Sequence, residues 1–120
     1  ELEAPLRELA PESFEAAEAL LEATRDIDLL VRRAAFTAMA ALTVPPPSVA
    51  SRLLEAVRED DDPASRRLAA LSLGEIGSAD PQAISQEAIG QLRDEEQRSE
   101  DLDLRRALQR ALARIADPVA

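Results

Sequence analysis

The residues whose types and spacing could do chemistry are three pairs of adjacent arginines. Each pair begins four residues after an aspartate, as in DIDLLVRR, DDDPASRR and SEDLDLRR. A guanidinium group donates two parallel hydrogen bonds and therefore suits carboxylate and phosphate groups. An aspartate just before a helix accepts hydrogen bonds from the free amides of the first turn. These motifs predict capped helices whose arginines either form ion pairs or bind an anionic partner.

The acidic residues offer no comparable arrangement for catalysis. The run Glu59–Asp62 lacks the alternating ligands, the glycine and the closing glutamate of a calcium loop, which favours a plain acidic turn. Glu95 and Glu96 are expected at a polar helix end, without the cleft that general acid–base catalysis needs. The chain has no Cys and no His, so the usual zinc ligands, the commonest general base and a thiol nucleophile are absent. We therefore expect no enzyme, no metal site and no cofactor.

The arginine pairs belong to an internal repeat that spans most of the 120 residues. Arg66 follows Arg32 by 34 residues, and Arg105 follows Arg66 by 39. Large apolar residues recur seven and ten positions after each of these arginines. The sequence predicts a helix after each aspartate, over residues 32–42, 66–77 and 105–116, in a chain that is almost free of sheet.

A second set of related segments lies between these helices. These segments are FEAAEALLEATRD from residue 14, SVASRLLEAVRED from residue 48 and AISQEAIGQLRDE from residue 83. Each has apolar residues at helical spacing, and prolines stand at or just before its start. The repeated unit is therefore a helix, a short acidic turn, a second helix and a loop, with boundaries near 11–44, 45–79 and 80–118. The third turn, EEQRSEDLD, is expected to be enlarged. Residues 2–9 are expected to form a short extra helix or the tail of an earlier unit.

The central unit carries the pattern DxDPxxRRxAAxxLGEIGxxDP, which resembles the HEAT-repeat family, in particular the HEAT-like repeats of the phycobilisome-lyase type. The resemblance implies an all-α, right-handed α-solenoid of three helical hairpins. It also implies that the turn aspartate and the first arginine of each pair are structural. We expect Asp62 to cap its helix and Arg66 to reach that carboxylate or the aspartate of an adjacent unit, which would make a ladder along the stack.

The second arginine of each pair lies about 100° further around the helix and needs another explanation. In solenoids of this family the second helices line the concave surface. The three expected helices carry eight arginines and one glutamate, a net charge of +7 in a chain of net −10. One interpretation is that these side chains only neutralise acidic turns and solvate a face. The other is that this face binds an acidic or phosphorylated protein segment. The residues expected to bind it are Arg33, Arg67, Arg106, Arg110 and Arg114.

A non-enzymatic scaffold for protein partners is the function that this sequence favours. The alternative implied by the resemblance is a component of a complex that attaches bilin chromophores to proteins. The absence of Tyr, Trp, His and Cys argues against it. Net charge argues against nucleic acid and membrane surfaces as partners. No apolar run approaches the roughly 18 residues of a membrane span, and we expect a cytoplasmic, bacterial protein, since the chain has fourteen arginines and no lysine.

The packing predicted from the repeat is specific enough to test. The core is expected to contain the repeated apolar set Leu20, Met39, Leu42, Leu54, Leu73, Ile76, Ile89, Leu112 and Ile115. Gly74 is expected to allow close packing, and Gly77 suits the end of its helix. The last helix, 105–116, has so many apolar residues that we expect the chain to be a piece of a longer array, or its end to be covered by a partner or by self-association.

Overall fold

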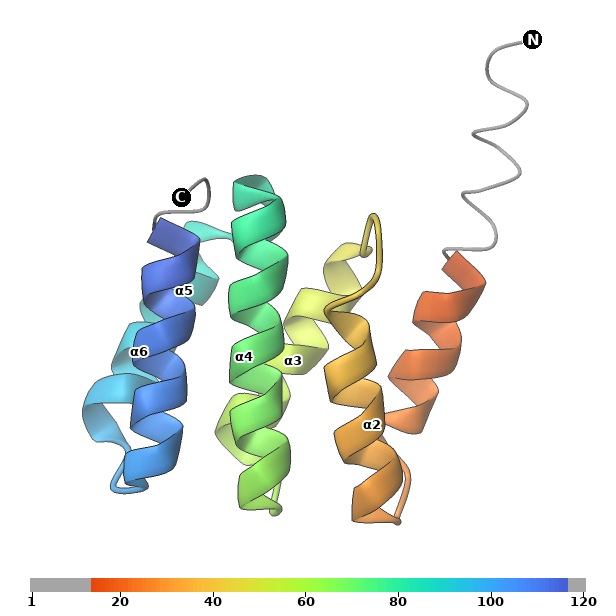
Figure 1. Cartoon of the computed structure of the whole chain (residues 1–120), viewed down its shortest axis with the longest axis horizontal. Coiled ribbons are helices and arrows are strands. Elements are labelled where there is room, and N and C mark those ends of the chain that lie inside the picture. Colours follow the sequence, from red (N-terminus) through yellow and green to blue (C-terminus); the bar gives the residue numbers. More distant parts are fainter. Residues whose placement is uncertain (1–13, 117–120) are drawn as a thin grey trace, which may run out of the picture.

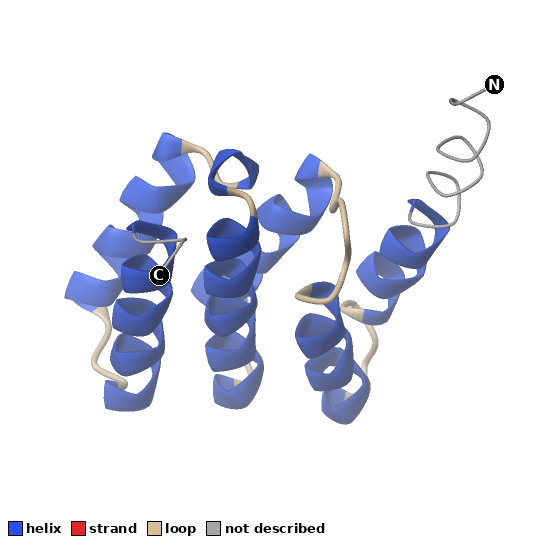
Figure 2. Cartoon of the chain, turned by 45° about the horizontal axis from the view of Figure 1, so that its top comes forward, coloured by secondary structure: helices blue, strands red, loops and turns tan. Residues whose placement is uncertain are grey.

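The computed structural model describes residues 14–116, and these residues are helical apart from turns (Figures 1 and 2). A helix of residues 14–23 is followed by α2 (Leu29–Met39), α3 (Pro47–Glu59), α4 (Pro63–Ala79), the short 3-10 helix η1 (Pro81–Ala83), α5 (Gln86–Arg98) and α6 (Leu102–Ala116). The described residues contain no strand. The predicted all-α class is confirmed, whereas the helix expected at residues 2–9 lies outside the described residues.

The helices form two layers of a stack. In Figure 1, α2, α4 and α6 stand side by side in front, and α3 and α5 lie behind them. The central helix α4 packs against α2, α3 and α6, and α5 packs against α6. Each helix thus buries its apolar face against its neighbours in the array. This arrangement is a helical solenoid.

Proline and short polar side chains determine where the helices begin. Pro47 and Pro63 occupy the first turns of α3 and α4, where the missing amide hydrogen costs no helical hydrogen bond. Ser85 caps α5 by accepting from the amide of Ala88 at 3.0 Å. Prolines were predicted to stand at or just before the starts of the first helices of the repeats, and Pro47 confirms this for α3. Pro81 instead begins η1, which leads into α5.

The spacing from Arg66 to Arg105 is five residues longer than the spacing from Arg32 to Arg66, and the additional length lies in a helix, not in a turn. The turns before α4 and α6 both have three residues, 60–62 and 99–101, so the predicted enlargement of the third turn is wrong. Instead α4 has 17 residues and α2 has 11. α2 stops at Met39 rather than at the predicted residue 42. The residues beyond it form tight turns and then meet three prolines, which disfavour helix in the residue before them.

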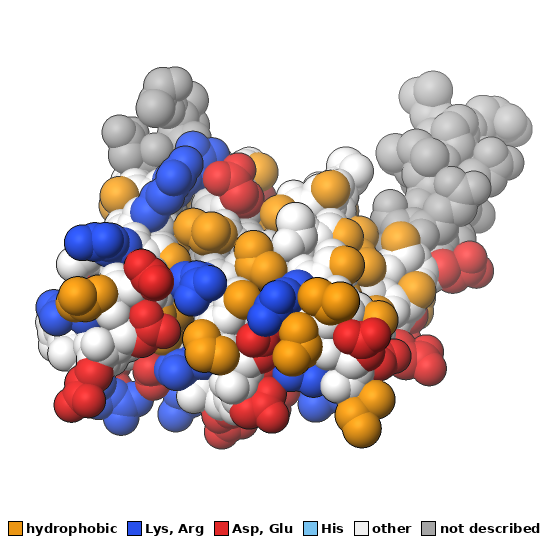
Figure 3. Space-filling view, turned by 60° about the horizontal axis from the view of Figure 1, so that its bottom comes forward, with side chains coloured by type: hydrophobic (Ala, Val, Ile, Leu, Met, Phe, Trp, Pro, Cys, Tyr) orange, Lys and Arg blue, Asp and Glu red, His pale blue; other side chains and the backbone are white. Residues whose placement is uncertain are grey.

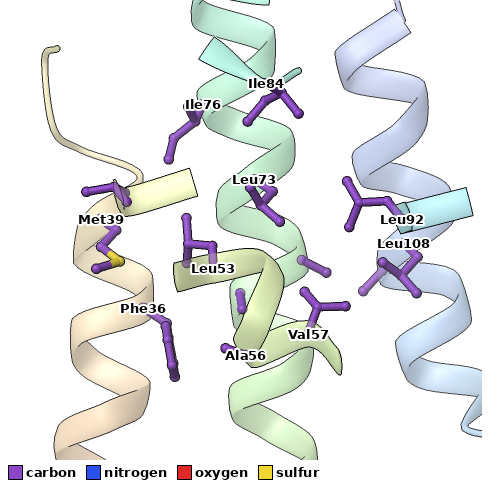
Figure 4. Close-up of a cluster of buried hydrophobic side chains, with 14 of the residues drawn as sticks. Phe36, Met39, Leu53, Ala56, Val57, Leu73, Ile76, Ile84, Leu92 and Leu108 are labelled. Atoms are coloured by element: carbon purple, nitrogen blue, oxygen red, sulfur yellow. The ribbon is translucent and has the colours of Figure 1, made fainter. Parts of the chain in front are cut away.

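The core runs through the whole stack and collects side chains from both layers (Figure 4). Of the predicted core set, Met39, Leu73, Ile76, Ile89 and Ile115 are buried. Its other members are partly buried against the same cluster: Leu20, Leu42, Leu54 and Leu112. Large apolar side chains that are fully buried and that the prediction omitted are Phe36, Val49, Leu53, Val57, Leu92, Leu104 and Leu108.

The last helix, α6, does not expose its apolar face at the end of the stack. Most of the apolar residues that suggested a further partner for it are buried within the described stack: Leu104, Ala107, Leu108, Ala111 and Ile115. The reason given for expecting a covered end at this helix is therefore wrong. These side chains face inward because α6 packs against both α4 and α5.

Two glycines let α4 and α6 approach each other closely. A Cβ atom on Gly74 would lie 2.8 Å from the Cα atom of Ala111, so the prediction of close packing there is confirmed. A Cβ atom on Gly77 would lie 2.6 Å from Cγ1 of Ile115. Gly77 lies inside α4, which continues to Ala79, so the predicted role at the helix end is wrong.

Candidate functional site

The three turn aspartates cap the helices that carry the arginine pairs. Oδ1 of Asp28 accepts from the amide of Leu30 at 2.9 Å. Oδ2 of Asp62 accepts from the amide of Ser65 at 3.1 Å, and also from its hydroxyl group at 2.8 Å. Oδ1 of Asp101 accepts from the amide of Leu104 at 3.2 Å. The predicted caps are confirmed, and they place both arginines of every pair in the second turn of a helix.

The first arginine of each pair has a structural contact, as expected, and Arg32 reaches aspartates of the adjacent unit, whereas Arg66 and Arg105 do not. Nη2 of Arg32 lies 3.3 Å from Asp60 and 2.9 Å from Asp61, which belong to the next turn along the chain. Arg66 donates from Nε to the carbonyl oxygen of Val57 at 2.8 Å. Within residues 14–116, none of these arginines pairs with the aspartate four residues before it. That carboxylate is engaged by the amides of its own helix.

In the second and third repeats, the first arginine of the pair contacts a glutamate of α5 instead of a turn aspartate. Nη2 of Arg66 lies 3.7 Å from Oε2 of Glu95, and Nη2 of Arg105 lies 3.6 Å from Oε2 of Glu96. Glu95 is buried, with 7% of its surface exposed, and is also paired with Arg58 and Arg98. Sequence reasoning assigned it to a polar helix end, which is wrong. The burial of Glu95 could have been predicted from its position, because it follows the buried residues Ile89 and Leu92 at intervals of three on the same helix face.

Two of the five arginines expected to bind a partner, which we call the second-set arginines, are held by the protein itself. Arg33 makes a bidentate pair with Asp62, with Nε 2.7 Å from Oδ2 and Nη2 2.9 Å from Oδ1. This pair holds the pKa of Asp62 well below its ordinary value and raises the pKa of Arg33. Nε of Arg114 lies 3.1 Å from Oε1 of Glu75, and its Nη2 lies 3.2 Å from the hydroxyl oxygen of Ser78. The expectation that the second-set arginines stand apart from the structural contacts is therefore wrong for Arg33 and Arg114.

The other three second-set arginines are brought together without a partner. Arg67, Arg106 and Arg110 make no ion pair or side-chain hydrogen bond with any residue in the described part of the chain. They surround a hollow of about 530 Å³ on the face formed by α2, α4 and α6. The rest of its lining consists of Arg33, Ala64, Leu68, Leu71, Asp103 and Ala107. We call this hollow the arginine groove.

The arginine groove combines a cationic rim with an apolar floor. Figure 3 shows this face with arginine side chains among apolar ones and with acidic side chains gathered along its lower edge. Over their observed bounds α2, α4 and α6 carry eight arginines and two acids, Glu75 and Asp103, a net charge of +6. The predicted +7 fell by one because α6 begins at Leu102 and so includes Asp103. Such a surface can bind carboxylate or phosphate groups that carry apolar neighbours.

Other kinds of site are not found among the described residues. No group of three or more carboxylates is placed to hold a metal ion between residues 14 and 116. None of the helices described here is long and apolar enough to cross a membrane. The run Glu59–Asp62 is occupied by a helix cap and by the pairs to Arg32 and Arg33.

Comparison with known proteins agrees with this architecture. The family model described as HEAT repeats matches residues 17–113, which covers every helix pair described above. No curated protein and no solved structure gives a significant match. Repeats of this family generally act as scaffolds for protein interactions rather than as enzymes. The match covers more than half of the chain and agrees with the stacked helix pairs, so this protein belongs to the HEAT-repeat family.

Proposed function

We propose that this protein is a non-enzymatic scaffold that binds an acidic or phosphorylated protein segment in the arginine groove. The observation that carries the proposal is the contrast among the second-set arginines. Arg33 and Arg114 are neutralised by Asp62 and Glu75, whereas Arg67, Arg106 and Arg110 have no counter-ion in the described chain. Three guanidinium groups around one hollow are a site for an anionic ligand.

Charge distribution supports a protein segment over nucleic acid. The helices of this face carry +6, and the remainder of the chain therefore carries −16. Long-range repulsion from that remainder opposes duplex DNA, which presents one phosphate charge about every 1.7 Å. A short segment that places its acids only in the groove avoids this repulsion. The right-handed sense of the solenoid, the repeat boundaries and the phycobilisome-lyase subtype remain predictions beside this proposal.

The test uses a fluorescent eight-residue peptide, EEDLLDEE, and its uncharged counterpart QQNLLNQQ, with affinity measured by fluorescence anisotropy. We expect the acidic peptide alone to bind, and binding to weaken as salt rises. Arg110→Glu should lower its affinity about tenfold, because an exposed ion pair contributes up to about 1 kcal/mol and the reversal adds a repulsion of similar size.

Arg93→Glu is the matched control. Arg93 is also an exposed helical arginine without an ion pair among the described residues, but it lies on α5, away from the groove lining. The two variants have the same net charge, so a non-specific charge effect would weaken both equally. Equal losses in the two variants, or no loss in Arg110→Glu, would exclude the arginine groove as the binding site.

A further inference from the structure

The first intra-repeat turn exposes an isoleucine that no packing requirement explains. Ile27 stands between Asp26 and Asp28, and 96% of its surface is exposed. The equivalent positions of the two later turns hold Asp61 and Glu100, which are also exposed. The fold thus accepts acids at this position. An aliphatic side chain there is a departure from the repeat that buries nothing in this chain.

A second aliphatic residue departs from the repeat on the same edge of the molecule. Leu30, in the first turn of α2, is 63% exposed. The equivalent residues are Ala64 in α4 and Asp103 in α6. Ile27 and Leu30, with the aspartates that flank Ile27, make an acidic and aliphatic protrusion that we call the DIDLL turn, residues 26–30.

Hydrogen bonds hold the DIDLL turn in one shape. Oδ1 of Asp26 accepts from the amide of Asp28 at 2.8 Å. Nη1 of Arg32 donates to the carbonyl oxygens of Asp26 at 3.0 Å and of Ile27 at 3.3 Å. Oδ2 of Asp26 and of Asp28 makes no hydrogen bond within the described residues. The turn therefore presents Ile27 between two carboxylates at little entropic cost on binding.

The chemistry of this turn is the complement of the arginine groove. The groove has Leu68, Leu71 and Ala107 in its floor and three unpaired arginines around them. An aliphatic side chain covered by that floor places its flanking carboxylates among guanidinium groups. A purely acidic segment would leave the apolar floor in water, so the DIDLL turn uses more of the lining than a polyacidic ligand could.

We propose that the DIDLL turn of one copy docks in the arginine groove of a second copy of this chain. The proposal rests on the anion-binding function proposed above and names its partner. The turn and the groove are different surfaces, so the contact is heterologous and leaves one free turn and one free groove on every dimer. Association thus continues beyond the dimer as concentration rises. The contact is small, and we expect a dissociation constant of about 0.1–1 mM.

Two variants separate the two halves of the contact. Ile27→Ser removes the most exposed aliphatic group of the turn and keeps the groove. The double variant Arg67→Glu, Arg110→Glu removes the groove and keeps the turn. All three positions lie on the surface or the groove rim, and thermal melts followed by circular dichroism check that each variant folds. At 1 mM chain and 0.15 M salt, sedimentation velocity should show oligomers for the parent chain and monomers for each variant alone.

Mixing the variants is the decisive measurement. When ¹⁵N-labelled Ile27→Ser chain is titrated with unlabelled double variant, amide shifts should change in α4 and α6 around the groove. With the labels exchanged, they should change in residues 26–30. The mixture should stop at a 1:1 dimer, because each copy has only one working surface. Titrating labelled Ile27→Ser chain with unlabelled Ile27→Ser chain is the control and should change nothing.

The proposal that the partner is a second copy would be overturned if the parent chain were monomeric at 1 mM. It would also be overturned if mixing the variants changed no amide shifts around the groove. The EEDLLDEE probe keeps that failure distinct from failure of the groove. Ile27→Ser must still bind this peptide if the groove function is right. Binding of the peptide without self-association leaves a different acidic and aliphatic protein as the partner, and loss of both refutes the groove itself.

Discussion

Replacing glycine by alanine is expected to raise the stability of this chain at one position and to lower it at another. Gly90 lies within α5 and is exposed, and a Cβ atom built there meets nothing within 4 Å. Gly90→Ala should therefore raise stability by about 1 kcal/mol, the difference in helix propensity. Gly74→Ala gains the same propensity, but its Cβ atom would lie 2.8 Å from the Cα atom of Ala111.

The clash at Gly74 outweighs the gain in propensity. Backbone of α6 cannot move aside as a flexible side chain can, and overpacking of this kind costs typically about 1–3 kcal/mol or more. With the propensity gain of about 1 kcal/mol subtracted, Gly74→Ala should lose up to about 2 kcal/mol. The two variants should thus differ by the cost of the clash, about 1–3 kcal/mol. Gly77→Ala should fall between them, because its nearest contact is the side chain of Ile115.

Thermal and urea melts followed by circular dichroism at 222 nm measure the difference. For a chain of this size 1 kcal/mol corresponds to a shift in Tm of about 4 °C, so Gly90→Ala should melt higher than the parent chain and Gly74→Ala lower. An equal rise in Tm for both variants would refute the close approach of α4 and α6. A fall for Gly90→Ala would refute the exposed position assigned to it.

Three other predictions follow from the packing and the ion pairs. Leu73→Ala, in the centre of the core, should cost about 2–5 kcal/mol in a urea melt, and an unchanged melt would place Leu73 outside the core. The pKa of Asp62 is lower in the folded chain than in the unfolded one, mainly because of Arg33, so this carboxylate stabilises the fold above its ordinary pKa and loses that effect as pH falls below about 4. Melting curves at pH 7, 4 and 3 should show the Tm advantage of the parent over Asp62→Asn shrinking with acid, and a constant advantage would contradict this linkage. Glu95→Gln should cost about 1–3 kcal/mol because three arginines lose a largely buried carboxylate, whereas Glu96→Gln, measured in the same melts, should cost less than 1 kcal/mol.

Helix positions and caps could be predicted from the sequence because their causes are local. Asp28, Asp62 and Asp101 precede their helices by one residue, and the apolar spacing within each segment fixes the buried face. The end of α2 was predicted three residues too late because the apolar pattern continues to Leu42. The three prolines that follow and the tight turns after Met39 end the helix earlier.

Ion-pair partners could not be predicted because they depend on how neighbouring repeats are placed. Arg33 and Arg67 occupy the same position of the repeat, yet Arg33 meets Asp62 while Arg67 meets no acid in the described residues. Asp101, the equivalent of Asp62, forms no ion pair with Arg67 in the described residues and instead caps α6. The same position of the repeat thus has a partner in one unit and none in the next, which the sequence pattern does not reveal.

The central helix α4 has two unlike junctions, and this asymmetry affects how the array loses its structure. Toward α2 the junction includes the Arg33–Asp62 pair and the hydrogen bond from the Ser72 hydroxyl to the carbonyl oxygen of Phe36. Toward α6 the junction is a close contact through Gly74 and Gly77, and the pair of Arg114 with Glu75 that also spans it is far more exposed than Asp62. Cooperativity in a linear array passes only between neighbours. We therefore expect acid to weaken the coupling of the first helix pair to the rest of the array before it weakens the contact between α4 and α6.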